Sequence, residues 1–420
     1  MVAAFETYRT RTEPSASLRP RLLQRAYLLL VALLGVSLFF LVINQQVSKP
    51  VPFLNLQEIK TSADKLTDAE RHSIIQGLEA DLVSEPLDLQ ILKKLALYWT
   101  ASSERARSDA LALILAQRSF RDVEAQALAL DISLKKQDYG QSIRILDAIL
   151  RTKEKSQAAL FPLLRAFAEN PGSLPALAGM LGHNPPWRAD FLIDFARNSE
   201  STDVPLQLMS MLKKTGSPAQ VNEIRALIVR LLKDHNYERA YYVWLDSLPA
   251  QDLKKTELVF DGGFEANNRG LIFDWTFSRR KNVDIRIASR GNSQADNALQ
   301  IDFVKNHGPF ADVSQMLYLS AGNYRLEGEA RTENLQNDRG LLWKIFCVNE
   351  SNQPLVATSR RNGTSDWNAF TADFNVPDGN CLMQRLVLVL DAKAALDQNI
   401  SGRIWYDNLK ITNLDLTQTE

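Results

Sequence analysis

Residues 298–304 read ALQIDFV, and the apolar side chains Leu299, Ile301 and Phe303 alternate with polar ones. This period of two places one face of a strand on a core and leaves the other polar. Further short runs of strand character follow, separated by turn residues at 306–309, 321–323 and 377–380. They read DVSQMLYL (312–319), YRLEGEART (324–332), GLLWKIFCV (340–348), NAFTADFNV (368–376), RLVLVLDA (385–392) and GRIWYDNLKI (402–411). Short strands at such close spacing predict an all-β antiparallel sandwich over residues 257–415.

Residues 54–250 have the period of helices instead. The stretch DLQILKKLALYW (88–99) places its apolar side chains on one helical face. About 34 residues separate two similar helices, a period typical of stacked helix pairs. The positions that repeat are Ser108, Leu111 and Leu115, which recur as Ser142, Ile145 and Ile149. The second copy resembles a tetratricopeptide repeat, although most consensus Trp, Leu-Gly and Pro positions are missing. We therefore predict an all-α domain of tetratricopeptide-like repeats.

Residues 26–43, AYLLLVALLGVSLFFLVI, contain no charged side chain. A helix of this length rises about 27 Å, close to the hydrocarbon thickness of a bilayer. Five arginines precede it, at positions 9, 11, 19, 21 and 25, and few charges follow it. The positive-inside rule then predicts a cytoplasmic tail (1–25), a single transmembrane anchor (26–44) and a periplasmic remainder. A cleaved signal peptide is the alternative, but the run is longer than usual and lacks a small-x-small site after it.

Composition excludes some functions and bears on the two cysteines. The chain has 49 basic and 49 acidic residues, so it lacks the basic excess of nucleic-acid-binding proteins. The four histidines are scattered without the spacing of metal ligands. Cys347 and Cys381 both lie in the last third of the chain. On the outer side of a bacterial inner membrane such a pair usually oxidises, which predicts a disulfide between neighbouring strands. Two buried free thiols are the alternative.

The order of LVFDGGFEANN (258–268), FDW (273–275), the strand runs and GRIWYDNLKI suggests a family. Together they resemble the galactose-binding-like jelly rolls of carbohydrate-binding modules attached to glycoside hydrolases. The resemblance implies a structural calcium near the chain ends, with Glu265 and Asp407 at the matching acidic positions. The alternative is that these two carboxylates only cap turns where the first and last strands meet. No other cofactor is expected.

Sugar-binding modules stack aromatic rings on sugars, but the tryptophans of this half have structural explanations. Trp343 alternates with Ile345 and Cys347 and should share their buried face, and Trp275, Trp367 and Trp405 match structural positions of the family. Ligand contacts are more plausible in loops. The candidates are Arg279, Arg280 and Lys281, and Arg360, Arg361 and Asn362. These clusters could meet an acidic polysaccharide, or could simply be solvated surface.

The sequence has no nucleophile elbow, phosphate loop or dinucleotide fingerprint, and no catalytic carboxylate pair can be identified in it. We therefore expect a protein that is not an enzyme. Its domain order resembles membrane-anchored tetratricopeptide proteins of bacterial exopolysaccharide systems. By analogy this implies an inner-membrane scaffold with a protein partner on its helical repeats and polysaccharide on its jelly roll. The alternative is a protein–protein adaptor of an envelope complex that does not bind sugar.

Overall fold

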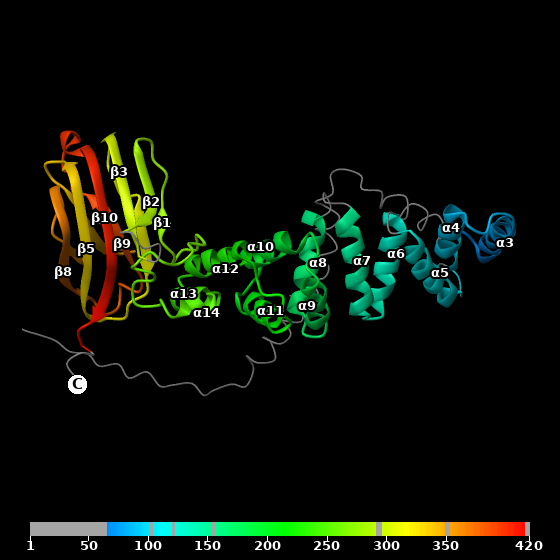
Figure 1. The fold of residues 1–420 in the computed structure, drawn as a ribbon. Helices are drawn as coiled ribbons and strands as arrows, with labels where there is room; N and C mark the ends of the chain where they lie inside the picture. Colours follow the sequence, from blue (N-terminus) through cyan, green and yellow to red (C-terminus); the bar gives the residue numbers. More distant parts are fainter. Residues whose placement is uncertain are drawn as a thin grey trace, which may run out of the picture. The chain divides into compact units, whose positions relative to one another are not determined.

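The computed structural model describes residues 65–415, except 101, 103, 120–121, 153–156, 291–295 and 349–352. Helices occupy the first part of this range and strands the last part, as the change of period predicts (Figure 1). The chain forms two compact units, Met1–Gln137 and Asp138–Glu420. The second unit contains helices as well as the whole sandwich, so the change from helix to strand is not the boundary between the units.

The described part of the first unit is helical. Leu92 and Ala96 pack against Leu115 and Ala125 in its core. Ser108 is buried, and its hydroxyl donates to the carbonyl oxygen of Ala96 at 2.6 Å. The helices are α3 (Asp68–Ser84), α4 (Leu89–Thr100), α5 (Arg105–Arg118) and α6 (Val123–Lys135).

The second unit begins with further helices, several of which contact the next helix but one in the chain, as α7 contacts α9, α8 contacts α10 and α10 contacts α12. Stacked helix pairs pack in this way, but their relation to tetratricopeptide repeats stays a prediction. The helices are α7 (Tyr139–Thr152), α8 (Gln157–Glu169), α9 (Leu174–Gly182), α10 (Arg188–Asn198), α11 (Asp203–Lys214), α12 (Val221–Lys233), α13 (Tyr237–Asp246) and α14 (Ala250–Leu253).

Trp187 and Arg188 anchor the start of α10, where the sequence has two prolines. The Trp187 indole is fully buried and donates to Asp147 Oδ1 at 2.9 Å. Arg188 is buried beside Glu223, with 3.2 Å between Nη2 and Oε2. Arg188 also donates to the carbonyl oxygens of Ser217 and Pro218, at 3.2 and 2.9 Å. It therefore ties the α11–α12 loop to α10.

The strands form two five-stranded antiparallel sheets. Sheet 1 has the order β1-β4-β9-β6-β7, and sheet 2 has the order β2-β3-β10-β5-β8. Neighbours in each sheet are mostly distant in sequence, as in a jelly roll, which confirms the predicted β-sandwich. The strands are β1 (Thr276–Phe277), β2 (Val283–Ser289), β3 (Asn297–His307), β4 (Val313–Leu317), β5 (Gly322–Gln336), β6 (Leu341–Cys347), β7 (Val356–Ala357), β8 (Gly363–Val376), β9 (Gln384–Leu390) and β10 (Asn399–Asn413), with the 3₁₀ helix η2 (Ala395–Gln398) before β10.

The core of the sandwich lies between the sheets. In β6, Trp343, Ile345 and Cys347 all point into it, as their alternation predicts. The Trp343 ring packs on Trp275 and Tyr406, with centroids 5.7 and 5.3 Å away. The predicted disulfide is present between Cys347, at the end of β6, and Cys381, in the loop before β9. Both cysteines are buried.

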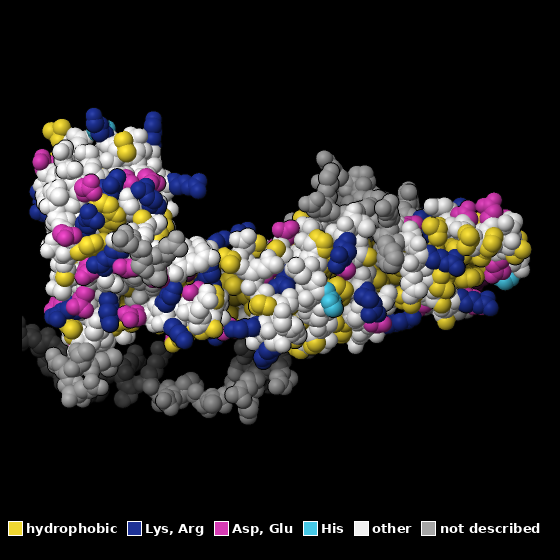
Figure 2. All heavy atoms as spheres, in the orientation of Figure 1, with side chains coloured by type: hydrophobic (Ala, Val, Ile, Leu, Met, Phe, Trp, Pro, Cys, Tyr) yellow, Lys and Arg dark blue, Asp and Glu magenta, His cyan; other side chains and the backbone are white. Residues whose placement is uncertain are grey.

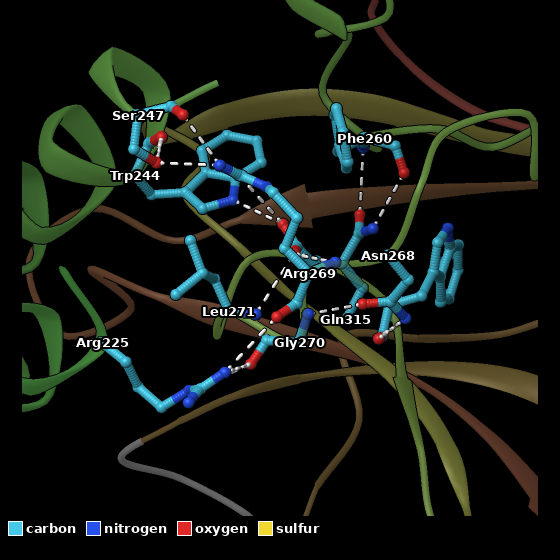
Figure 3. A network of polar contacts seen from close by, with 11 residues as sticks. Arg225, Trp244, Ser247, Phe260, Asn268, Arg269, Gly270, Leu271 and Gln315 are labelled. Carbon is cyan, nitrogen blue, oxygen red and sulfur yellow. Dashed lines mark hydrogen bonds and ion pairs between the residues drawn. The ribbon is translucent and has the colours of Figure 1, made fainter. Parts of the chain in front are cut away.

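Helices α12 and α13 share a second core with the sandwich. Trp244 of α13 packs edge-on against Phe260 and at a tilt against Phe273, with ring centroids 5.1 and 5.6 Å apart. Its indole donates to buried Asp274 at 2.7 Å. Figure 3 shows this contact together with Arg269, whose Nη1 donates to the Ser247 carbonyl oxygen at 2.8 Å. The last helices and the sandwich are thus held as one body.

No helix among the described residues is long and apolar enough to cross a membrane. The predicted anchor, residues 26–44, and the tail before it lie outside the described residues. The anchor therefore stays a prediction.

Candidate functional site

The outer face of sheet 2 carries two tryptophans. Trp405 of β10 alternates with Ile404 and Tyr406, which point into the core, so its ring lies on the outside. The guanidinium carbons of Arg331 and Arg403 lie 4.9 and 5.4 Å from its ring centroid. These cations cover the ring, and Trp405 is buried although it is outside the core.

Trp367 of β8 is covered in the same way. The guanidinium of Arg290 lies 4.0 Å from its ring centroid. Two carboxylates hold this arginine in place, Asp407 at 2.6 Å and Glu329 at 2.7 Å. Stacking on a sugar requires an open ring face, and cation–π contacts use that face here. On the outer face of sheet 2 both tryptophan rings are therefore covered by arginines and do not form an open aromatic platform.

An open groove lies instead at one end of the sandwich, where β3 and β5 end and β10 begins. We call it the end groove, and its volume is about 480 Å³, within the usual range of ligand sites. Figure 2 shows basic side chains and a histidine at this end. The lining residues are Lys305, Asn306, His307, Gln336, Asn337, Asp338, Leu396, Asn399, Ile400 and Ser401.

The walls of the end groove are braced by their own hydrogen bonds. Asn337 donates through Nδ2 to the carbonyl oxygens of Asp397 and Asn399, at 2.7 and 2.6 Å. His307 Nδ1 lies 2.6 Å from Asn399 Oδ1. Gln336 pairs with Ser401 across β5 and β10 and is exposed. Amides and hydroxyls both donate and accept, which suits the hydroxyl groups of sugars.

Carboxylates are scarce in the end groove. Of the lining residues that the structure describes, Asp338 is the only one with an acidic side chain. Glycoside hydrolysis generally needs two carboxyl groups on opposite sides of the bond. The described lining of the groove therefore does not supply that pair.

A cluster of charges adjoins the end groove. Asp391, just after β9, is bonded by Arg339, Lys344 and Arg360, which come from the β5–β6 loop, β6 and the segment after β7. We call these four residues the Asp391 cluster. Burial opposes ionisation, but hydrogen bonds from Arg360 and Lys344 hold the pKa of Asp391 below its usual value.

The structure places the four candidate arginines differently. Arg360 belongs to the Asp391 cluster. Arg361 turns toward the core, with its guanidinium carbon 5.4 Å from the Phe370 ring centroid. Arg280 is paired with Asp312, and Arg279 is exposed beside it. Only Arg360 therefore belongs to a larger basic site.

Glu265 and Asp407 lie near each other, because a Cβ on Gly263 would be 3.8 Å from the Glu265 Cγ and 3.9 Å from the Asp407 Oδ1. Both carboxylates are already engaged. Glu265 accepts from the Asn297 backbone and side-chain nitrogens, at 2.6 and 2.9 Å, and Asp407 accepts from Arg290. Among the described residues there is no group of three or more acidic, His or Cys side chains that could hold a metal. Both carboxylates therefore have protein partners in this structure, and the structural calcium stays a prediction.

A second groove lies among α11, α12 and α13. It measures about 750 Å³, and its lining includes Leu206, Met209 and Val243. Ion pairs between α11 and α13 flank it, formed by Arg239 with Asp203 and by Lys213 with Asp246. Tyr242, Ile224, Leu227 and Leu248 also line it. We call it the helical groove, and its apolar lining suits a protein segment better than a sugar.

Some site residues were not predicted. The sequence 306–309 was interpreted as a turn, although its Asn306 and His307 line the end groove. Arg339, Lys344 and Asp391 gave no signal because they are brought together from three separate segments. The polar amides next to this turn are the sequence signal that could have identified the groove.

No protein-family model and no curated protein matches the chain. The solved structures similar to it include a family 4 carbohydrate-binding module (16% identity, 37% of this chain and 99% of that one, TM-score 0.27). A family 61 module in complex with β-1,4-galactotriose is also similar (17%, 38% and 99%, TM-score 0.26). So is a xylan-binding domain from Paenibacillus barcinonensis (14%, 36% and 92%, TM-score 0.23). Similarity this low does not bear on the ligand of this chain.

Proposed function

We propose that this chain is a non-catalytic scaffold, anchored in a bacterial inner membrane and periplasmic for most of its length, that acts in polysaccharide assembly or export. Its sandwich would bind glycan in the end groove. The observation that carries the proposal is the lining of this groove by amides, a hydroxyl and an imidazole, with one carboxylate. Such groups suit many sugar hydroxyls and offer no acid–base pair.

Binding of polysaccharides by the purified full-length chain in detergent tests the proposal. Gln336→Ala and His307→Ala remove exposed polar groups from the groove, and each should weaken binding about fivefold or more if it loses one hydrogen bond. Asn375→Ala is the matched control, since this exposed amide lies on β8 outside the groove. If no polysaccharide binds, or if the control weakens binding equally, glycan binding in the end groove is wrong.

The predicted topology rests on the uncharged run at 26–43 and the arginines before it. Reporter fusions test it separately from sugar binding. Alkaline phosphatase fused after residue 415 should be active, because this enzyme needs the oxidising periplasm for its disulfides. An inactive fusion, with an active cytoplasmic reporter at the same site, would contradict a periplasmic sandwich.

The helical groove favours a second candidate function, a protein–protein adaptor. Its apolar lining and the exposed ring of Tyr242 could hold a segment of a partner protein. Tyr242→Asp should abolish such binding, measured in cells as loss of crosslinks from a crosslinker at Met209 in the same groove, and should leave polysaccharide binding by the purified chain intact. A chain that is crosslinked to a partner and binds no polysaccharide would favour the adaptor over the glycan-binding scaffold.

A further inference from the structure

The Asp391 cluster has more positive charge than its carboxylate can neutralise. Lys344 Nζ lies 3.3 Å from Oδ1, while Arg360 Nη2 and Arg339 Nη2 lie 2.6 and 3.4 Å from Oδ2. Three cations therefore surround one anion. Asp397 also interacts electrostatically with Arg339. When Asp397 is counted as a second anion, the three cations still leave a surplus of one positive charge.

This surplus is partly shielded from water. The side chains of Arg339, Lys344 and Asp391 are 26%, 22% and 15% exposed, whereas that of Arg360 is 52% exposed. A single arginine would neutralise Asp391, and each added cation repels the others at short range. Partial burial strengthens this repulsion because it reduces screening. An additional anion would relieve it, and Arg360 is the cation most accessible to that anion.

The geometry of Arg360 leaves donors for such an anion. Its Nε and Nη2 both bond Asp391 Oδ2, at 2.9 and 2.6 Å. Its Nη1 makes no contact among those described. Guanidinium groups bind carboxylate and sulfate through planar, charge-assisted hydrogen bonds. Arg360 can therefore hold Asp391 on one side and a ligand anion on the other.

The cluster is continuous with the end groove through the β5–β6 loop. Asn337 and Asp338 line the groove, and Arg339 follows them directly. Asn337 Oδ1 accepts from the backbone nitrogens of Arg339 and Gly340, at 2.8 and 2.7 Å. Arg339 Nε in turn donates to the Asp391 carbonyl oxygen at 3.2 Å. The side chain that supports the groove thus also sets the position of the cluster.

We propose that the Asp391 cluster binds the anionic group of an acidic polysaccharide whose hydroxyl groups occupy the end groove. This inference rests on the proposed glycan binding and adds the class of ligand. The anionic group is a carboxylate or a sulfate ester, which the guanidinium recognises by the same chemistry. Neutral polysaccharides would lack the contact to Arg360.

Pairs of polymers that share a backbone and differ in charge test the inference. The full-length chain in detergent is titrated with polygalacturonate and its methyl ester, and with dextran sulfate and dextran. We expect at least tenfold tighter binding to the charged member of one pair, since loss of a charge-assisted hydrogen bond has about this effect. The pair that responds identifies carboxylate or sulfate as the anion.

Variants separate the cluster from charge in general. Arg360→Gln should lose this preference, and Lys344→Gln, at a less exposed position, should reduce it. Arg325→Gln is the matched control because Arg325 is 42% exposed and paired with Asp373 on sheet 2, away from the cluster. Unchanged melting temperatures would show that the variants fold.

The remaining outcomes distinguish failure of the anionic ligand from failure of glycan binding itself. Binding of neutral and charged polymers with equal affinity would overturn the anionic ligand and leave glycan binding standing. A preference for charge that survives Arg360→Gln, or that Arg325→Gln removes equally, would overturn the role of the cluster. Absence of binding to every polymer would overturn both proposals.

Discussion

The contact between Trp244 and Asp274 should determine whether α13 and the sandwich unfold together. Trp244 is 1% exposed, and its Nε1 lies 2.7 Å from the Asp274 carboxylate, which is equally buried. Trp244→Phe keeps an aromatic ring and removes the N–H donor. A hydrogen bond to a charged group contributes about 1.5–3 kcal/mol. We expect Trp244→Phe to lower the free energy of unfolding by about that amount.

Asp274 has other donors, and these limit the loss. Its Oδ2 accepts from the backbone nitrogens of Arg269 and Leu271, both at 3.1 Å. The carboxylate therefore remains bonded in Trp244→Phe. Trp244→Ala additionally removes the ring from among Tyr241, Phe260 and Phe273, for which a loss of about 3–5 kcal/mol is typical.

Thermal unfolding of the full-length chain, followed by calorimetry and near-ultraviolet circular dichroism, measures these changes. A double-mutant cycle with Trp244→Phe and Asp274→Asn should give a coupling energy of about 1–2 kcal/mol, because the residues are in direct contact. Trp99→Phe, in the first compact unit, is the control for loss of an indole. Strictly additive effects, or a Trp244→Ala variant that melts like the wild type, would refute a shared core.

Three other changes test separate contacts. Replacing both Cys347 and Cys381 by Ala should destabilise the sandwich by about 4 kcal/mol, because the bridge closes a loop between residues separated by 34 positions. Equilibrium unfolding in denaturant, with and without reductant, measures this loss. Chelator should leave the melting temperature of the wild type unchanged, because Arg290 already neutralises Asp407. Arg290→Gln should lower the melting temperature, because it leaves the buried carboxylate without its cation. A wild type that chelator destabilises would instead support calcium. Burial raises the pKa of Asp261 from 3.8 to about 6, so between these pH values the folded state binds a proton that the unfolded state does not. The free energy of unfolding should therefore fall as the pH rises from 4 to 6. Asp261→Asn should flatten this dependence in melting curves, and an unaltered pH profile would contradict it.

Local patterns predicted most of the secondary structure. The alternation of Leu299, Ile301 and Phe303 indicated a strand, and all three residues point into the core of the sandwich. Helical periodicity likewise identified residues 88–99, where Leu92 and Ala96 are buried. Such patterns succeed because burial on one face imposes a short, regular spacing.

Long-range contacts were not predictable in this way. Arg339 and Asp391 are 52 positions apart, and Trp244 and Asp274 are 30 apart. Neither separation matches the period of a helix or a strand. The order of strands in the sheet brings Arg339 and Asp391 together, and helix packing brings Trp244 and Asp274 together. Trp405 is buried, and its sequence position did not show that Arg331 and Arg403 cover it on the outside of the sandwich. Burial alone did not reveal which face it occupies.

The shared core bears on how a bound glycan would be held. It includes Met316 and Met383, which lie near the end of β4 and just before β9. Asp391 follows the other end of β9, and strands rise about 3.3 Å per residue. The seven residues of β9 thus separate this core from the Asp391 cluster by about 23 Å. In the proposed function, polysaccharide would therefore be held at the end of the sandwich away from the helical contact, and the helices of the second unit would remain available to a partner protein.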